Sequence, residues 1–318
     1  MIGEKAGVSG RIGAVTGRTW EPREGDDAPA ARPSPLVIAH RGASDLLAEH
    51  TLAAYEQAIA DGADGLECDV RLTADGVLVC VHDRRIDRTS DGRGVVSAKS
   101  YSELAERDFG SWKYADAGAG VGAVAGPRTD AEADADAAAG LLLGPGDLPL
   151  RAKSGNVMAL EQLLELVVEA PRPIDLAIET KHPVRYGGLV EDRVVSMVRR
   201  FGLEHAEPGA PTVRVMSFSE VAVRRMRALA PDIATVMLMD RVPLRSRSGW
   251  LPGGARIAGP GIHIVRAHPG YVARVHSAGS QVHVWTVNEP ADIDLCIELG
   301  VDAIISNRPS AVLRRLGR

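Results

Sequence analysis

The feature that most limits how this 318-residue chain can fold is a regular alternation of short apolar runs with helical patterns. Buried strands are expected at residues 36–40, 65–71, 174–179, 212–217, 233–238, 261–265, 281–287 and 302–306. Amphipathic helices are expected between most of them, at residues 51–61, 160–169, 189–201, 219–229, 271–278 and 291–299. Strands that alternate with helices favour a parallel sheet covered by helices. Because this number of strands suits a closed ring better than an open sheet, we predict an α/β fold, a (β/α)8 TIM barrel.

Three stretches depart from this alternation. Ala74-Asp75-Gly76 is a turn signal, so the second strand should continue into a hairpin that ends near His82. Residues 115–147 are dominated by Ala, Gly, Asp and Pro, which predicts a flexible surface insertion after the second strand. The spaced glycines at 118, 120 and 122 follow no strand and precede no clear helix, which argues against a dinucleotide-binding loop. Prolines and glycines at 241–260 make the helix after the fifth strand weak.

Composition narrows the class of protein. The chain is 45% hydrophobic and 25% charged, which is ordinary for a soluble globular protein. Residues 1–34 lack any helical or strand period and are expected to form a disordered tail before one barrel domain at 35–318. The net charge of −5 gives no reason to expect a nucleic-acid partner. No apolar run is long enough to span a membrane and no secretory signal is present, so we expect a cytoplasmic protein.

The cysteines carry no evident chemistry. Cys68, Cys80 and Cys296 are widely spaced and form no C-x-x-C pair. Neither a thiolate zinc site nor a disulfide framework is indicated, and we expect all three to be small buried side chains. The oligomeric state stays open.

Polar residues gather where three of the predicted strands end. The first strand ends at His40-Arg41, the second carries Glu67 and Asp69 and leads through its hairpin to His82, and the third ends at Glu179 and continues to Lys181. In an α/β barrel, the reactive residues lie at the carboxyl ends of the strands and in the loops that follow. We therefore expect these side chains to meet at one end of the barrel.

The carboxylates among these residues predict a metal site. Residues i and i+2 of a strand face the same side, so Glu67 and Asp69 must share a face, as must Glu179 and Lys181. A lone carboxylate in a strand is more often part of a structural ion pair. Three that converge would repel one another unless a cation lies between them, and all-oxygen ligands suit Mg²⁺ or Ca²⁺ better than zinc.

His40 and His82 each precede a charged residue at a strand end, which indicates a functional role. The other unassigned histidines have no partner that the sequence identifies, and we expect them to be structural: His182, His205, His263, His268, His276 and His283.

A set of short motifs runs in order along the chain: His40-Arg41-Gly42-Ala43-Ser44, Glu49-His50-Thr51, Glu67-Cys68-Asp69-Val70, His82-Asp83, Arg88-Thr89-Ser90-Asp91-Gly92, Ile178-Glu179-Thr180-Lys181, Trp285-Thr286-Val287-Asn288 and the segment 302–309. This ordered set resembles the motifs of the glycerophosphodiester phosphodiesterases. It runs from about Leu36 to Arg315. Any one motif is weak alone, but the ordered set with its spacing is specific.

This resemblance implies a role for each candidate residue. Metal binding would fall to Glu67, Asp69 and Glu179, and acid–base catalysis to His40 and His82. We take His40 as the base and His82 as the acid, an order that the sequence itself leaves open. The same comparison implies that Arg41 and Lys181 hold the phosphate and that Trp285 forms an aromatic wall near the substrate alcohol. Two departures stand out, namely His50 where the family usually has Asn, and a longer insertion at 115–147.

The expected activity is the metal-dependent hydrolysis of glycerophosphodiesters to glycerol 3-phosphate and an alcohol. The expected partner is therefore a small-molecule substrate. The preferred alcohol stays open, as does the choice between water and a neighbouring glycerol hydroxyl as nucleophile. One alternative is a lysophospholipase D-type activity, in which Trp285 and an apolar lip at 141–143 would admit an acyl chain. The other is a barrel without catalytic activity that only binds phosphodiesters or a partner, which the intact set of candidate residues disfavours.

Overall fold

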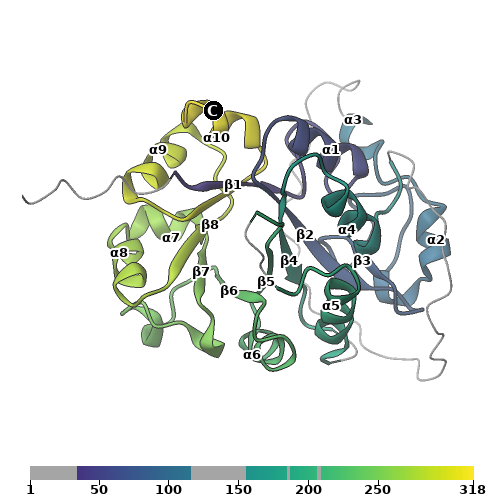
Figure 1. The fold of residues 1–318 in the computed structure, drawn as a ribbon. Coiled ribbons are helices and arrows are strands. Elements are labelled where there is room, and N and C mark those ends of the chain that lie inside the picture. The colour runs from purple at the N-terminus through teal and green to yellow at the C-terminus, as the bar shows by residue number, and fades with distance from the viewer. Residues whose placement is uncertain (1–33, 116–154, 185–186, 206–208) are drawn as a thin grey trace, which may run out of the picture. The chain divides into compact units, whose positions relative to one another are not determined.

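The fold is a closed barrel of parallel strands surrounded by helices (Figure 1). In the computed structural model, residues 34–115, 155–184, 187–205 and 209–318 are described. They belong to one compact unit, Ser34–Arg318. The predicted tail at 1–34 and the predicted insertion at 115–147 lie almost wholly outside the described residues.

The barrel closes because its first strand pairs with two neighbours. β1 (Leu36–His40) runs parallel to β2 (Gly65–Leu72) on one side and to β9 (Ala303–Ser306) on the other. The remaining parallel strands complete the ring in the order β4 (Asp175–Thr180), β5 (Val213–Ser217), β6 (Ala234–Met239), β7 (Ile257–Pro260) and β8 (Gln281–Val284). In Figure 1, purple β1 therefore lies close to yellow α10 (Pro309–Arg315) at the other end of the chain. The predicted TIM barrel is confirmed.

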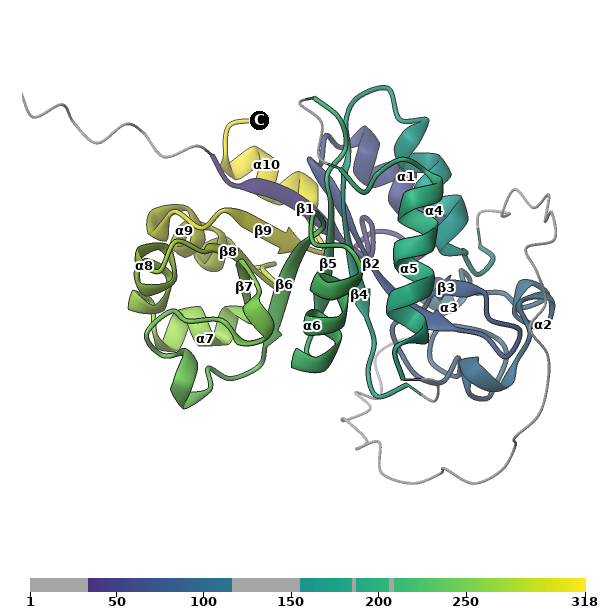
Figure 2. The same ribbon diagram turned by 60° about the horizontal axis from the view of Figure 1, so that its bottom comes forward.

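Helices cover the outside of the ring (Figure 2). Those that follow or precede the barrel strands are α1 (Leu52–Ala60), α4 (Leu160–Val168), α5 (Leu189–Arg200), α6 (Glu220–Leu229), α7 (Ile262–Ala267), α8 (Gly270–Ser277) and α9 (Pro290–Leu299). In α5, Val190, Val194 and Val198 recur every four residues and are all buried, so one apolar stripe packs against the strands. Cys68, Cys80 and Cys296 are free and buried, as expected.

The expected hairpin after the second strand is present. β3 (Leu78–Cys80) pairs antiparallel with the carboxyl end of β2, and Cys80 lies opposite Val70. Short helices follow, namely η1 (Val96–Ala98), α2 (Tyr101–Ala105) and α3 (Trp112–Ala115). They pack around a small apolar cluster of their own that includes Ile86, Leu104 and Phe109.

One predicted strand is wrong. The apolar run at 261–265 lies at the start of α7, and the barrel strand in this part of the chain is β7 at Ile257–Pro260. A five-residue apolar run fits a strand or one face of a short helix equally well. The segment between β6 and β7 contains only the 3-10 turns η3 (Leu244–Ser246) and η4 (Pro252–Gly254) among its described elements, in agreement with the weak helix expected there.

Candidate active site

Strand register brings the candidate residues together at the carboxyl end of the barrel. His40, the last residue of β1, lies directly opposite Glu67 on β2, and Asp69 lies opposite Glu179 on β4. Because alternate residues of a strand face the same side, Glu67 and Asp69 both point toward the barrel axis. These four side chains thus come from three adjacent strands and meet at one place.

The three carboxylates form a compact buried group. Glu67, Asp69 and Glu179 are 1%, 0% and 7% exposed, and one oxygen of each lies within 4.8 Å of the others. Burial raises the pKa of Glu179 to about 7, and the nearby Asp69 charge acts in the same direction. Burial likewise raises the pKa of Glu67, again with help from Asp69. The protein's own cations therefore do not neutralise this group fully, and its oxygens suit a divalent ion.

Lys181 lies beside the same carboxylates. Its Nζ atom is 2.8 Å from Asp69 Oδ1 and 2.7 Å from Glu179 Oε1. Burial by itself would raise the pKa of Asp69, but the charges of Lys181 and Arg41 outweigh that effect and hold it well below its usual range. Asp69 is therefore the permanently charged member of the group.

Arg41 connects the end of β1 to this group. Its backbone N–H donates to Glu67 Oε2 at 3.0 Å, and its Nε lies 3.0 Å from Asp69 Oδ2. Its φ angle is +57°, and that of His50 is +61°, a left-handed conformation that non-glycine residues rarely adopt. Both strained residues contact the carboxylates, and backbone strain of this kind tends to cluster at functional sites.

Each candidate catalytic histidine has one ring nitrogen fixed by a neighbour. His40 Nδ1 lies 2.6 Å from the side-chain oxygen of Asn307, and His82 Nδ1 lies 2.7 Å from Asp83 Oδ1. Since both partners are acceptors, the Nδ1 atoms carry hydrogen and Nε2 is the nitrogen left to exchange a proton. Burial lowers the pKa of His40 to about 3, and the charge of Arg41 adds to this, so His40 is neutral near pH 7.

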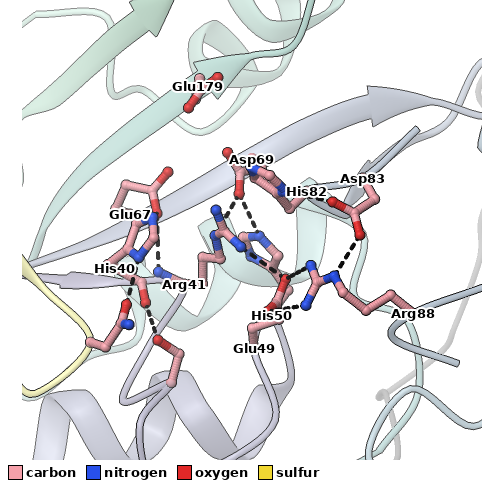
Figure 3. A network of polar contacts seen from close by, with 12 residues as sticks. His40, Arg41, Glu49, His50, Glu67, Asp69, His82, Asp83, Arg88 and Glu179 are labelled. Carbon is pink, nitrogen blue, oxygen red and sulfur yellow. Dashed lines mark hydrogen bonds and ion pairs between the residues drawn. The ribbon is translucent and has the colours of Figure 1, made fainter. Parts of the chain in front are cut away.

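A chain of alternating charges joins the surroundings of the two histidines (Figure 3). Asp83 Oδ2 accepts from Arg88 Nε at 2.6 Å, and Arg88 also binds Glu49 at 2.8 Å. Glu49 in turn accepts from Arg41 at 3.0 Å. This series of contacts runs from His82 to the carboxylates without interruption. A change of charge at any one member should therefore alter the electrostatic environment of the others.

His50 occupies a buried place behind the carboxylates. Its Nε2 lies 2.9 Å from Asp69 Oδ2, and its Nδ1 lies 2.8 Å from the Tyr55 hydroxyl of α1. Burial lowers the pKa of His50 although the Asp69 hydrogen bond opposes this. The departure noted in the sequence thus contacts a candidate metal ligand directly.

Trp285 lies just after β8 and packs against the apolar residues inside the barrel, such as Ile38 and Val236. Its Nε1 donates to Gly259 O at 2.7 Å, and its ring meets Phe218 edge-on at 5.4 Å between centroids.

A hollow of about 650 Å³ lies elsewhere on the protein. It is lined by residues such as Thr51, Asp108 and Tyr114 and by none of the candidate residues.

Sequence reasoning gave no role to Asp83, Arg88, Glu49 and Asn307. The first three belong to motifs that follow His82 or precede His50, so their position beside predicted site residues was a usable signal. Asn307 contacts His40 across 267 positions of sequence, and only barrel closure brings it there. Of the histidines expected to be structural, His182 binds the buried Glu191 at 2.5 Å and His276 binds Asp302 at 2.8 Å.

Comparison with known proteins gives one consistent family. The model of the Glycerophosphoryl diester phosphodiesterase family matches residues 40–311. A Mycobacterium tuberculosis protein named "Probable glycerophosphodiester phosphodiesterase 1" is 41% identical over 277 residues, covering 86% of this chain and 90% of that protein. A Bacillus subtilis glycerophosphodiester phosphodiesterase is 29% identical over 283 residues, covering 86% and 84%.

Solved structures agree with the fold. A glycerophosphodiester phosphodiesterase from Agrobacterium tumefaciens is 26% identical, with a TM-score of 0.63 over 88% of this chain and 99% of that one. A phosphodiesterase from Oleispira antarctica, solved in complex with the product sn-glycerol-3-phosphate, has a TM-score of 0.68 at 22% identity over 90% of this chain and 98% of that one. The second likeness concerns the fold alone.

Proposed function

Because the chain belongs to the glycerophosphoryl diester phosphodiesterase family and is a phosphoric diester hydrolase, we propose that it hydrolyses glycerophosphodiesters to glycerol 3-phosphate and an alcohol. The observation that carries the proposal is the buried group Glu67, Asp69 and Glu179 at the barrel end where His40 and His82 also lie. Phosphodiester cleavage needs positive charge near the phosphoryl oxygens and two proton transfers. The residues at this end of the barrel can supply both.

The three carboxylates would hold one divalent ion, Mg²⁺ or Ca²⁺. Three buried oxygen ligands and the raised pKa values of Glu67 and Glu179 fit a hard cation. When bound, such an ion supplies Lewis-acid stabilisation of charge on the phosphoryl oxygens. Arg41 and Lys181 would add fixed positive charge on the same side, because both already lie within 3.0 Å of Asp69.

His40 would accept a proton from the nucleophile through Nε2. It suits a base because it is neutral near pH 7 and because Asn307 holds its Nδ1–H. His82 would donate a proton to the leaving alkoxide through its own Nε2. Its side chain is 34% exposed, and Asp83 at 2.7 Å would stabilise the charged ring. One P–O bond forms, one breaks, and each histidine ends in the opposite protonation state.

A lysophospholipase D-type activity remains the second candidate, and one observation favours it. Phe218 is 42% exposed and packs edge-on against Trp285, so the barrel mouth has an apolar side that could contact an acyl chain. The proposed lip at 141–143 lies outside the described residues. A barrel that only binds phosphodiesters is disfavoured by family membership and by the intact set of site residues.

Release of glycerol 3-phosphate from glycerophosphocholine tests the proposal. Purified protein stripped with EDTA should be inactive, and Mg²⁺ or Ca²⁺ should restore turnover. Lysophosphatidylcholine assayed in parallel separates the two candidate activities. Full turnover in chelated protein would remove the metal from the proposal, and no hydrolysis of any glycerophosphodiester with either ion would overturn the substrate class. We also propose a cytoplasmic location, which cell fractionation can check.

A further inference from the structure

One long stretch of the sequence contains arginines and no acidic residue. From Arg241 to Asn288 the sequence contains six arginines and no aspartate or glutamate, in a chain whose net charge is −5. This stretch spans the segment after β6 and continues through β8. Arg245 and Arg266 pair with Glu220 and Asp292, so the excess positive charge of this stretch comes from its other arginines.

The same segment exposes large apolar side chains. Leu244, in η3, is 78% exposed, and Trp250 is 51% exposed. Both lie in the segment that leads from the carboxyl end of β6, where the candidate active site lies, to the start of β7. Exposed leucine and tryptophan that flank arginines are typical of a surface that meets lipid headgroups.

Side-chain contacts connect this loop to the mouth of the barrel. Arg245 forms an ion pair with Glu220 at the start of α6, and its guanidinium lies 5.7 Å from the Trp250 ring centroid. Val221, 45% exposed, follows Glu220 directly, and Phe218, 42% exposed, lies two residues before it. Phe218 in turn packs edge-on against Trp285.

Two arginines of the loop are available to an outside partner. Arg241 and Arg247 are exposed, and within the described parts of the chain neither guanidinium forms an ion pair with a carboxylate. Arg245 is already engaged by Glu220, and Asp240, which is also exposed, is the acidic residue adjacent to the loop. The uncompensated charge at this surface is therefore positive.

We propose that this surface docks the enzyme on an anionic lipid bilayer. We call it the lipid-facing loop and define it by Arg241, Leu244, Arg247 and Trp250. Leu244 and Trp250 would enter the headgroup region while the two arginines contact anionic headgroups. Among the described residues, no helix could span a membrane. Such contact would place this flank of the barrel at a lipid surface, a property beyond the proposed hydrolysis of soluble diesters.

Co-sedimentation with vesicles tests the docking. The wild-type protein should bind vesicles of phosphatidylglycerol mixed with phosphatidylcholine, bind pure phosphatidylcholine much less, and release at high salt. The double variant Leu244→Ser/Trp250→Ser should lose about tenfold or more in binding. Arg241→Gln/Arg247→Gln should lose roughly 25-fold, since each arginine near an anionic surface contributes about fivefold.

Matched control variants distinguish binding through the lipid-facing loop from nonspecific adsorption to vesicles. Val168 is also 51% exposed but ends α4, which precedes β4 and so lies at the opposite end of the barrel. Val168→Ser and Arg314→Gln should bind vesicles like wild type. Arg314 is an exposed residue of α10. Turnover of soluble glycerophosphocholine should stay unchanged in all variants if that activity is present, which shows that they fold.

Three results would overturn the docking proposal. They are absence of vesicle binding, equal loss in the control variants, and wild-type binding in both loop variants. A dimer that dissociates in the loop variants, without vesicle binding, would assign the surface to a second copy of the chain instead. Because none of these readouts uses hydrolysis, failure of the docking proposal is distinct from failure of the proposed function.

Discussion

The Nε2 atom of His50 lies 2.9 Å from Oδ2 of Asp69, so the loop before α1 holds a carboxylate of β2 in place. Asp69 is charged and can only accept, which fixes the proton of the neutral His50 ring on Nε2. On the other side of the ring, Nδ1 lies 2.8 Å from the Tyr55 hydroxyl, which also donates to the Glu67 backbone carbonyl at 3.3 Å. His50 is therefore oriented from both sides, in the manner of residues that support metal ligands from behind.

Replacing His50 should change metal affinity more than it changes the fold. We expect His50→Ala to weaken Mg²⁺ or Ca²⁺ binding by about 10–100-fold, because Asp69 loses one of the contacts that orient it. His50→Asn keeps a donor and should recover part of the loss. Isothermal titration of metal into stripped protein measures both. Equal affinity in His50→Ala and wild type would show that Arg41 and Lys181 suffice to position Asp69.

Glu67→Gln should have opposite effects on the thermal stability of the metal-free protein and of the metal-bound protein. In the folded protein the pKa of Glu67 lies above its unfolded value, so its ionised form costs stability at pH 8. Without metal, the variant should melt at the same temperature as wild type or higher. With Mg²⁺ or Ca²⁺ the wild type should gain stability and the variant much less. A variant that melts well below wild type in EDTA would contradict this account.

His40→Ala and His82→Ala should each separate chemistry from stability. We expect turnover to fall by roughly 10²–10⁴, the usual contribution of a positioned proton-transfer group. Stability should fall by about 1 kcal/mol, because each ring makes one side-chain hydrogen bond. The double variant should be much less impaired than the product of the single effects. His263→Ala, which removes an exposed histidine bonded only to Asp240 O, is the control and should keep full turnover.

Asp83→Asn tests the orientation of His82. An amide can present its N–H to the ring instead of accepting from Nδ1, so the proton would move to the wrong nitrogen. We expect the rate constant to fall by about 10²-fold or more with little change in KM or melting temperature. Asp87→Asn is the matched control, because Asp87 is an exposed aspartate paired with Arg85. An equal fall in both variants would point to general loss of surface charge.

His283 should make the barrel sensitive to acid. It is 1% exposed, its Nδ1 has no partner within the described structure, and burial, with the charge of Arg214, lowers its pKa to about 3. Since the unfolded pKa is about 6.5, the unfolded chain binds the proton first, and stability falls as pH drops below that value. We expect a loss of up to about 2 kcal/mol between pH 7 and pH 5.

Urea unfolding across that pH range measures the effect. His283→Gln should remove one part of the dependence and leave the part due to His40, whose pKa burial also lowers to about 3, whereas His276→Gln, which leaves both residues in place, should keep the whole. Identical pH slopes in wild type and His283→Gln would assign the acid sensitivity to other groups.

The parts of the molecule that sequence could predict are those with local signals. β1, β2 and β4 are apolar runs that end in polar residues, so both the strands and the candidate ligands were recognisable. β7 was missed because Gly259 and Pro260 give no strand pattern. The barrel requires a glycine at 259, because a Cβ atom there would lie 2.7 Å from the side chain of Leu238. The apolar residues nearby belong to α7 instead.

The parts that sequence could not predict depend on register and closure. Arg88 reaches Glu49 across 39 positions, and Asn307 reaches His40 across 267. No periodicity encodes such contacts, because they arise when strands and loops are brought together in space. The pairing of Lys181 with two expected metal ligands was hidden for the same reason, since it depends on the side chains of two adjacent strands.

The contact between His40 and Asn307 has a consequence for when the protein becomes active. A nascent chain still attached to the ribosome could already hold Glu67, Asp69 and Glu179 together, since their strands are neighbours. The His40 ring would turn freely until the segment after β9 emerged and supplied its acceptor. Hydrolytic competence should therefore arise only at the end of synthesis, and a chain clipped before Asn307 should stay inert even if most of its strands have assembled.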